Sequence, residues 1–307
     1  MDYVLRTFDL CKRYKNQLAL NCANLNIERG DIYGFVGENG SGKTTIIRVI
    51  TGLISANEGS YELFGVRSDS PEITEARKRI GAIVESPSIY LNMSARENLL
   101  TQCGILGISD KSRVEKTLAE VGLAELYDSS KKAGNFSLGM RQRLGIAMAL
   151  LGDPEFIILD EPMNGLDPAG IVEIRELILR LNQERGITFL ISSHILTELS
   201  LVASKYGIIS KGRVIREITA EELKNECQRT TSLTVDKPEE LCELLARTYP
   251  EDSFRRTVGG ALLLGEISLN ELFSSIIEAG ISILGVICAQ ASIEDFYLSV
   301  VGGTGNA

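Results

Sequence analysis

A glycine-rich stretch, Gly37-Glu-Asn-Gly-Ser-Gly-Lys43-Thr44, constrains the fold of this chain more than any other feature. It follows the apolar run 32–36 and precedes residues 44–53, whose apolar positions have helical spacing. In such a loop, glycines at 37, 40 and 42 let successive backbone N–H groups converge on phosphate oxygens, and the next helix directs its positive N-terminus at the same point. The order strand, loop, helix therefore predicts a phosphate-binding loop in an α/β fold.

The side chains that follow the glycines predict which phosphates are bound. Lys43 is expected to reach the β- and γ-phosphates of a nucleotide, the Thr44 hydroxyl to bind Mg²⁺, and Thr45 to assist at the α-phosphate. The remaining predicted contacts to the nucleotide come from the loop itself: Gly37, Glu38, Asn39, Gly40, Ser41 and Gly42.

A second motif, Phe156-Ile-Ile-Leu-Asp160-Glu161, ends an apolar strand with two carboxylates. Because side chains alternate along a strand, the two acids are expected to have separate roles. Asp160 is predicted to take part in Mg²⁺ binding, and Glu161 to act as the general base that polarises the attacking water. The alternative for both is an ordinary solvated strand end.

His194 is the single histidine of the chain, and it follows the strand-like run Phe189-Leu-Ile-Ser-Ser. With the glycine loop and the paired carboxylates, it completes the residue types of an ATP hydrolysis site. The alternative, a structural role, is the commoner fate of a lone histidine.

The rest of the first 220 residues has the pattern of a doubly wound α/β sheet interrupted by helices. Compact apolar runs at 156–159, 187–191 and 207–209 predict buried parallel strands, with a helix at 168–184. Between about 86 and 151 the pattern is largely helical, with candidate helices at 94–106, 111–121 and 138–151. This region predicts an inserted helical subdomain.

A second, small α+β domain is predicted for residues 221–307. Its segments follow the order strand (232–235), helix (238–247), two strands around Gly259-Gly260, helix (269–279) and strand (281–287). That order is typical of a ferredoxin-like β-α-β-β-α-β unit.

Composition excludes some functions. The chain has 32 basic and 41 acidic residues and a net charge of −9, which disfavours a nucleic-acid partner. Six cysteines lack the C-x-x-C spacing, and we interpret them as small buried hydrophobes in a reducing cytoplasm. No apolar run approaches the roughly 20 residues that span a bilayer, so the protein is not expected to cross a membrane itself.

These motifs, in this order, resemble the ATP-binding subunits of ABC transporters over about residues 3–220. The resemblance implies a P-loop NTPase cassette with a mixed sheet, a RecA-like core and the inserted helical subdomain. By that resemblance, Phe136-Ser-Leu-Gly-Met-Arg-Gln-Arg is the signature sequence. Ser137 and the Gly139 backbone would then contact the γ-phosphate bound by a second ATP-binding subunit, so that ATP is sandwiched in a dimer.

The sequence departs from the family pattern in two segments. Leu138 and Met140 replace a glycine and a glutamine of the signature, and Glu85 stands where the family usually has a glutamine. A carboxylate at position 85 can ligate Mg²⁺ but cannot donate a hydrogen bond as an amide does. Both departures resemble the subgroup that exports bacitracin and lantibiotic-type peptides.

The resemblance assigns three further residues. Tyr14 is similar to the aromatic residue that stacks on adenine, although a half-buried surface tyrosine is the alternative. The segment Asn164-Gly-Leu-Asp167, which ends at Asp167, is similar to the loop that communicates across the dimer. His194 matches the switch histidine, which would hydrogen-bond the γ-phosphate and hold Glu161 and the water in line.

The resemblance implies an ATPase with ATP and Mg²⁺ as cofactors that powers export through separate membrane permease subunits. The expected substrate is an antimicrobial peptide or a lipid-like molecule. The segment Ser88-Ile-Tyr-Leu-Asn-Met93 is a candidate docking surface, although its apolar residues could also pack inside the subdomain. The protein would be cytoplasmic and peripheral on the inner face of the membrane. Alternatives are a soluble ABC-type ATPase and a weakly hydrolysing, nucleotide-dependent regulator.

Overall fold

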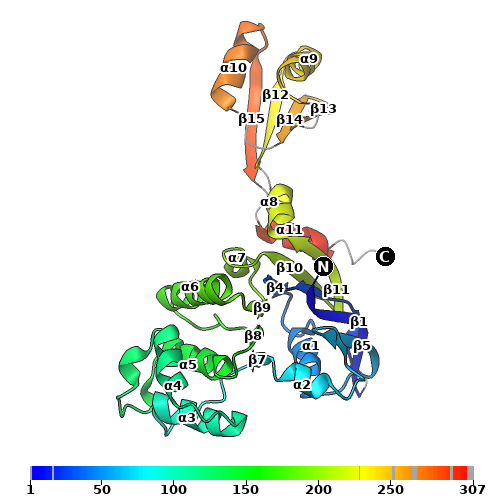
Figure 1. The fold of residues 1–307 in the computed structure, drawn as a ribbon. Coiled ribbons are helices and arrows are strands. Elements are labelled where there is room, and N and C mark those ends of the chain that lie inside the picture. The colour runs from blue at the N-terminus through cyan, green and yellow to red at the C-terminus, as the bar shows by residue number, and fades with distance from the viewer. Residues whose placement is uncertain are drawn as a thin grey trace. The chain divides into compact units, whose positions relative to one another are not determined.

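The structure is a computed structural model that describes residues 2–15, 17–227, 229–250, 253–264, 268–290 and 293–302. The chain forms two compact units, Met1–Ala220 and Glu221–Ala307 (Figure 1). Within the described part of the chain, none of the helices combines the length and the apolar character that a membrane crossing requires.

The first unit is built on a six-stranded sheet in the order β11-β10-β4-β9-β8-β7. Neighbouring strands are parallel except at the antiparallel pair β10–β11. Parallel strands have their carboxyl ends at the same end of the sheet, so the segments that follow β4, β8 and β9 lie close together there. The strands are β4 (Ile32–Val36), β7 (Ile80–Ile83), β8 (Phe156–Asp160), β9 (Thr188–Ser193), β10 (Lys205–Ser210) and β11 (Arg213–Thr219).

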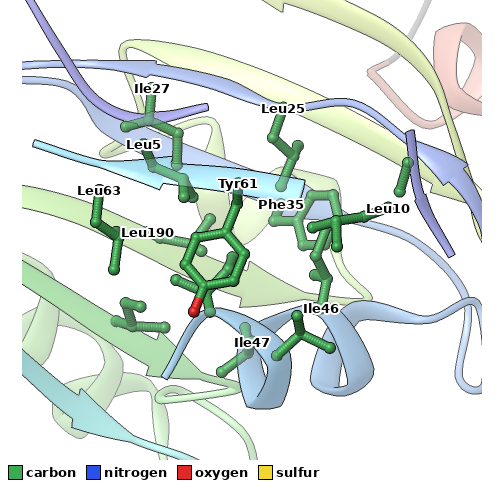
Figure 2. Close-up of a cluster of buried hydrophobic side chains, with 14 of the residues drawn as sticks. Leu5, Leu10, Leu25, Ile27, Phe35, Ile46, Ile47, Tyr61, Leu63 and Leu190 are labelled. Atoms are coloured by element: carbon green, nitrogen blue, oxygen red, sulfur yellow. The ribbon is translucent and has the colours of Figure 1, made fainter. Parts of the chain in front are cut away.

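A second, antiparallel sheet covers helix α1 (Lys43–Ile50), which lies between the two sheets. Ile46 and Ile47 of α1 are fully buried in the shared hydrophobic cluster, where Figure 2 shows them with Phe35 and residues of the antiparallel strands. Each such side chain contributes roughly 1.5–3 kcal/mol by leaving water. The second sheet comprises β1 (Tyr3–Tyr14), β2 (Gln17–Ala23), β3 (Asn26–Glu28), β5 (Glu58–Leu63) and β6 (Val66–Arg67).

Helix α1 is shorter than the sequence pattern predicts. The helical spacing extends to Leu53, but the helix ends at Ile50 because Gly52 adopts a left-handed conformation with φ +80°. Leu53 is consequently exposed beyond the helix end.

The predicted helical subdomain lies between β7 and β8 (Figure 1). Its helices are α3 (Ala95–Leu106), α4 (Ser112–Glu120) and α5 (Leu138–Leu150), with short 3₁₀ turns at Ala124–Leu126 and Ala133–Asn135. Ser94 and Glu97 form a capping box that fixes the start of α3. The other helices of this unit are α2 (Ile73–Arg77), α6 (Pro168–Arg185) and α7 (Leu196–Leu199).

The second unit contains an antiparallel sheet in the order β13-β14-β12-β15. Strands β12 and β13 both run antiparallel to β14 and flank it, which is the split arrangement of a ferredoxin-like unit. Residues of α9 and α10 share one core with Leu233 of β12 and Leu263 of β14. Its elements are α8 (Ala220–Glu226), β12 (Arg229–Val235), α9 (Pro238–Thr248), β13 (Phe254–Thr257), β14 (Gly260–Leu264), α10 (Leu269–Glu278), β15 (Ile283–Gln290) and α11 (Ile293–Gly302).

Candidate functional site

The glycine loop, residues 37–42, connects the carboxyl end of β4 to the N-terminus of α1. Gly40 and Gly42 have φ angles of +82° and +116°, a conformation that glycine adopts without a steric penalty. At Gly37 the backbone is ordinary but the space is closed, because a Cβ atom would lie 2.4 Å from the carbonyl oxygen of Ile209. Glycine is thus required at these three positions, by the backbone conformation at 40 and 42 and by the lack of space at 37.

A hairpin turn braces the glycine loop from the side. Lys211 and Gly212 join β10 to β11 with φ angles of +47° and +78°. The Gly212 amide donates a hydrogen bond to the Ser41 carbonyl at 2.8 Å. The position of the loop is therefore set by a turn about 170 residues away in sequence, which no local motif indicates.

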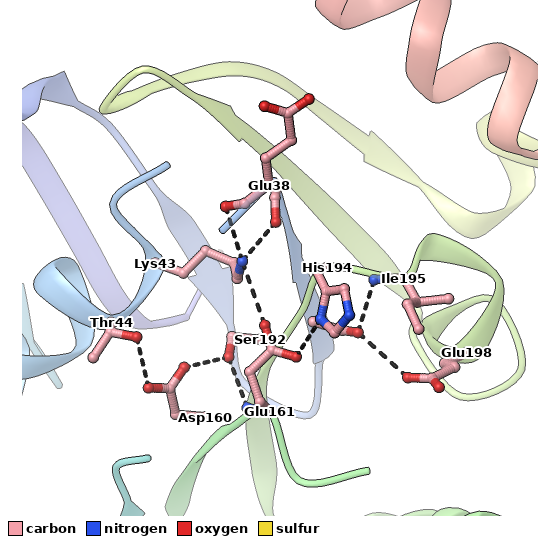
Figure 3. Close-up of polar contacts among 11 residues, drawn as sticks. Glu38, Lys43, Thr44, Asp160, Glu161, Ser192, His194, Ile195 and Glu198 are labelled. Carbon is pink, nitrogen blue, oxygen red and sulfur yellow. Dashed lines mark hydrogen bonds and ion pairs between the residues drawn. The ribbon is translucent and has the colours of Figure 1, made fainter. Parts of the chain in front are cut away.

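Lys43, the first residue of α1, is only 5% exposed. Its Nζ donates to the carbonyl oxygens of Gly37 at 2.5 Å and Glu38 at 3.3 Å, and lies 3.4 Å from Glu161 Oε1. Figure 3 shows the Glu38 carboxylate directed away from Lys43, so the backbone of Glu38 makes this contact. The ammonium group is thereby fixed at the mouth of the loop.

Asp160, at the end of β8, lies next to Thr44 (Figure 3). Its Oδ2 accepts a hydrogen bond from Thr44 Oγ1 at 2.8 Å, and its Oδ1 accepts one from Ser192 Oγ at 2.5 Å. The carboxylate is 2% exposed, and a buried carboxylate requires such partners. The two residues that the sequence assigns to Mg²⁺, Thr44 and Asp160, are thus in contact.

Glu161 follows directly and has a left-handed backbone with φ +51°. Non-glycine residues rarely adopt this conformation, and it persists here because the Glu161 amide donates to Ser192 Oγ at 2.9 Å. The carboxylate lies between Lys43 and His194, whose Nδ1 is 2.8 Å from Glu161 Oε2. The structure therefore brings together Lys43, Glu161 and His194 from three separate segments.

An open cavity of about 320 Å³ adjoins the glycine loop. It is lined by Tyr14, Gln17, Ala19, Asn39, Gly40, Gly42, Lys43, Thr44, Thr45 and Glu161. Two buried oxygens at this site, Ser41 Oγ and Glu161 Oε1, have no hydrogen-bond partner among the described residues. Glu161 Oε1 has only the ionic contact with Lys43 among the described residues, and a buried oxygen without a hydrogen bond is costly, so the site suits a polar ligand with donor groups.

Ser192 is a site residue that the sequence pattern does not identify. It pairs with Asp160 in the register of β8 and β9, and its hydroxyl links the two carboxylate residues by donating to Asp160 and accepting from the Glu161 amide. In the sequence, the one indication of this role is that Ser192 lies two residues before His194. That separation is informative only when the pairing of β8 with β9 is known.

The residues predicted to act from a second subunit do not line this cavity. Ser137 caps α5 by accepting from the Met140 amide at 3.2 Å, and Asp167 caps α6 by accepting from the Gly170 amide at 3.1 Å. A Cβ atom on Gly139 would meet only the Leu166 side chain, at 3.9 Å. The start of α5 is therefore adjacent to the loop that carries Asp167.

Glu85 is not in the Thr44–Asp160 network. Its carboxylate forms an ion pair with Arg48 at 2.6 Å, and its side chain is 63% exposed. Like Glu161, it has a left-handed backbone, with φ +64°.

A sequence profile of the family described as ABC transporter matches residues 20–164. The chain is 41% identical over 308 residues to the bacitracin transport ATP-binding protein BcrA of Bacillus licheniformis, covering 99% of both chains. The chain belongs to the ATP-binding proteins of ABC transporters. This cassette is also 41% identical over 214 residues to the lantibiotic transport ATP-binding protein SrtF of Streptococcus pyogenes, covering 70% of this chain and 90% of that protein.

The fold is similar to that of a solved ATP-binding cassette. The dimeric structure of a post-hydrolysis state of the ATP-binding cassette MJ0796, bound to ADP and Pi, aligns with a TM-score of 0.63 and 26% identity, covering 70% of this chain and 98% of that one. The cassette fold, the family and the ATPase activity predicted from the sequence are confirmed. The protein is the ATP-hydrolysing subunit of an ABC transporter.

Replacing Ser192 with alanine is expected to lower the turnover of ATP about tenfold with little change in ATP affinity. The lost hydrogen bond, worth about 1–1.5 kcal/mol, leaves Asp160 and Glu161 less well positioned. Steady-state ATPase assays and ATP titration measure the two quantities. Ser200→Ala, which removes a half-buried hydroxyl that donates to the Thr197 carbonyl, is the matched control. Unchanged turnover in Ser192→Ala would exclude the positioning role.

Proposed function

We propose that this ATPase powers the export of a peptide antibiotic, or a similar amphipathic molecule, through separate membrane permease subunits, and acts at the cytoplasmic face of the membrane. The support is the match over nearly the whole chain to a bacitracin transport ATP-binding protein and, over the cassette, to a lantibiotic transport ATP-binding protein. The observation that carries the catalytic part is the convergence of Lys43, Asp160, Glu161 and His194 at one end of the parallel sheet.

In hydrolysis, water attacks the γ-phosphorus, and the bond to the β-phosphate oxygen breaks. We assign Glu161 as the base that accepts the proton of the water, since its carboxylate has one oxygen bonded to His194 and one that lacks a hydrogen bond within the described residues. His194 faces Glu161 with Nδ1, and its other ring nitrogen, Nε2, would contact the γ-phosphate. Lys43 offsets phosphate charge beside both.

The nucleotide is proposed to lie along the glycine loop with its adenine on Tyr14. Tyr14 lines the same cavity as Thr44 and Thr45 and is 41% exposed, so its aromatic side chain is accessible for stacking. The backbone amides of residues 37–42 and the N-terminus of α1 would bind the phosphates.

Thr44 and Asp160 fit Mg²⁺, because a hydroxyl and a carboxylate oxygen 2.8 Å apart are the hard oxygen ligands that this ion prefers. Among the described residues, no group of three or more acidic, histidine or cysteine side chains could hold an ion without the nucleotide. When bound, Mg²⁺ would neutralise developing phosphate charge. Thr44 and Asp160 would orient it, and Ser192 would hold Asp160 in place.

We propose that two cassettes enclose each ATP, and the dimeric state of the relative bound to ADP and Pi supports this arrangement. Ser137 and Gly139 stand at an exposed helix start whose amide groups can bind an anion, and they lie apart from the cavity of their own chain. They would therefore complete the site of a second subunit, with Asp167 alongside.

Replacing Glu161 with glutamine is expected to lower turnover by at least about a hundredfold, the usual contribution of a general base, while ATP binding is retained. The variant should then accumulate as an ATP-bound dimer, detectable by size-exclusion chromatography with light scattering. Glu75→Gln, at an exposed surface pair with Lys78, serves as the control. A variant with undiminished turnover, or one that stays monomeric with ATP and Mg²⁺ and its membrane partners, would contradict the assignment.

Glu85 is proposed to join the Mg²⁺ site once it leaves Arg48. Glu85→Ala should then raise the Mg²⁺ concentration needed for half-maximal ATPase activity about threefold to tenfold, the range expected for losing one weak or water-mediated ligand. Arg48→Ala removes the ion-pair partner but keeps the carboxylate, and should leave that concentration unchanged or lower it. Unchanged Mg²⁺ dependence and turnover in Glu85→Ala would rule out the metal contact.

The permease subunits are proposed to dock where the helical subdomain meets β7. A groove of about 430 Å³ there is lined by β7, by Pro87 and Ser88, and by apolar side chains that include Leu53 and Leu106. Tyr90 and Leu91 of the predicted docking segment are exposed. An apolar groove of this kind suits a short amphipathic helix of the membrane subunit.

Aspartate at both Leu53 and Leu106 is expected to abolish co-purification with the membrane subunits, because a charge would have to be desolvated in the groove. ATP binding by the isolated cassette should be unchanged, since neither residue lines the nucleotide cavity. Ile105→Asp is the control: it is exposed on the same helix as Leu106 but lies outside the groove. Co-purification that survives the double substitution would place the docking surface elsewhere.

A further inference from the structure

Cys11 and Cys22 lie side by side in the antiparallel sheet of the first unit. Their sulfur atoms are 3.6 Å apart, and the Cys22 amide donates to Cys11 Sγ at 3.1 Å. Cys22 is exposed and Cys11 is partly exposed, so the interpretation of all cysteines as small buried hydrophobes is wrong for this pair. The physical reason is the pairing of β1 and β2, which brings together two residues that share no cysteine motif.

A β-bulge holds the two thiols in this position. The register changes from Leu10↔Ala23 to Lys12↔Leu20, so that Cys11 faces two residues of β2 rather than one. Cys22 has a left-handed backbone with φ +52°, and the Asn24 side chain fixes it by donating to the Cys22 carbonyl at 3.2 Å. The sulfur atoms are thus close because the backbone is fixed on both strands.

The bulge is connected to the glycine loop by two backbone hydrogen bonds. The amide of Asn21, next to Cys22, donates to the Gly212 carbonyl at 2.9 Å, and the Gly212 amide donates to the Ser41 carbonyl at 2.8 Å. The same hairpin carries Tyr14 and Ala19 of the nucleotide cavity. A displacement of Cys22 is therefore transmitted to the loop that binds phosphate.

We propose that Cys11 and Cys22 form a redox modification site that low-molecular-weight disulfides such as oxidised glutathione convert to an intramolecular disulfide, and that this bond weakens nucleotide binding. One thiolate attacks the small disulfide, giving a mixed disulfide and one free thiol. The second protein thiolate then attacks the protein sulfur of the mixed disulfide and releases the second small thiol. Two protein thiols are oxidised, and one small disulfide is reduced to two thiols.

Weaker binding follows from the geometry of the bond. A disulfide has a sulfur–sulfur distance of about 2.05 Å, so the two sulfur atoms must approach each other by more than 1 Å, about the movement that strains a hydrogen bond. The bulge residue Asn21 moves with Cys22, which strains the link through Gly212 to Ser41. A loss of about one hydrogen bond corresponds to roughly threefold to tenfold lower ATP affinity.

The other cysteines provide an internal comparison. Cys103, Cys227 and Cys242 are buried, whereas Cys288 is exposed beside the Thr231 hydroxyl at 3.7 Å. Oxidised glutathione should therefore leave a stable mixed disulfide at Cys288 and a protein cross-link at the hairpin.

The full-length protein with Cys288→Ser is treated with oxidised glutathione and mapped by mass spectrometry without reduction. We expect a linked peptide pair containing Cys11 and Cys22, an ATP affinity lowered threefold to tenfold, and recovery of that affinity with dithiothreitol. Cys11→Ser in the same background should form only a mixed disulfide at Cys22. If the variant itself binds ATP differently before oxidation, each protein is compared with its own reduced form.

Separate glutathione adducts on Cys11 and Cys22 without a cross-link, or a cross-link with unchanged ATP affinity, would overturn the inference. Because the readout is ATP affinity, the effect on binding rests on the proposed nucleotide site, whereas the cross-link does not. Absence of ATP binding in the reduced protein would contradict the proposed site, and peptide mapping would still decide whether the disulfide forms.

Discussion

The buried carboxylate of Asp160 fixes the relative positions of the parts of the site. It accepts hydrogen bonds from Thr44 at the start of α1 and from Ser192 on β9, and it lies at the end of β8. Removing either donor would leave a carboxylate oxygen buried without that partner, which costs at least as much as an ordinary hydrogen bond contributes. The helix that follows the glycine loop is thereby attached to β8 and β9, and Glu161 is positioned through the same serine.

Two acidic residues that follow strands of the parallel sheet have a left-handed backbone. Glu161 and Glu85 both have left-handed φ angles. Glu161 follows the last residue of β8 directly, and Glu85 lies two residues after the end of β7. Such conformations persist only where the surrounding structure specifies them. Glu161 is held by hydrogen bonds to Ser192 and His194, whereas Glu85 forms an exposed ion pair with Arg48. Glu161 is therefore held more firmly than Glu85.

Local motifs predicted much of the site because each one encodes its own geometry. The glycine loop requires a strand before it and a helix after it, so Lys43 and Thr44 could be placed from the sequence. The helices that follow Ser137 and Asp167 could be placed from their apolar spacing, which predicts helices at 138–151 and 168–184. The order of elements was also sufficient for the ferredoxin-like topology of the second unit.

Contacts that depend on strand register could not be predicted in this way. Ser192 acquires its role only when β9 pairs with β8, and Gly212 reaches Ser41 only when β10 lies beside β4. The pairing of Cys11 with Cys22 depends on a bulge that shifts the alternation of two strands by one residue. The early end of α1 was missed because apolar spacing continued past Gly52, whose left-handed backbone stops the helix.

The enclosure of α1 between two sheets has a consequence for the thermodynamics of ligand capture. The glycine loop begins on a buried strand, ends on a buried helix and is hydrogen-bonded to a hairpin turn, so its conformational entropy is lost when the protein folds. Binding of phosphate then has little further entropic cost from ordering the glycine loop. Most of the free energy of the phosphate contacts therefore contributes to the observed affinity.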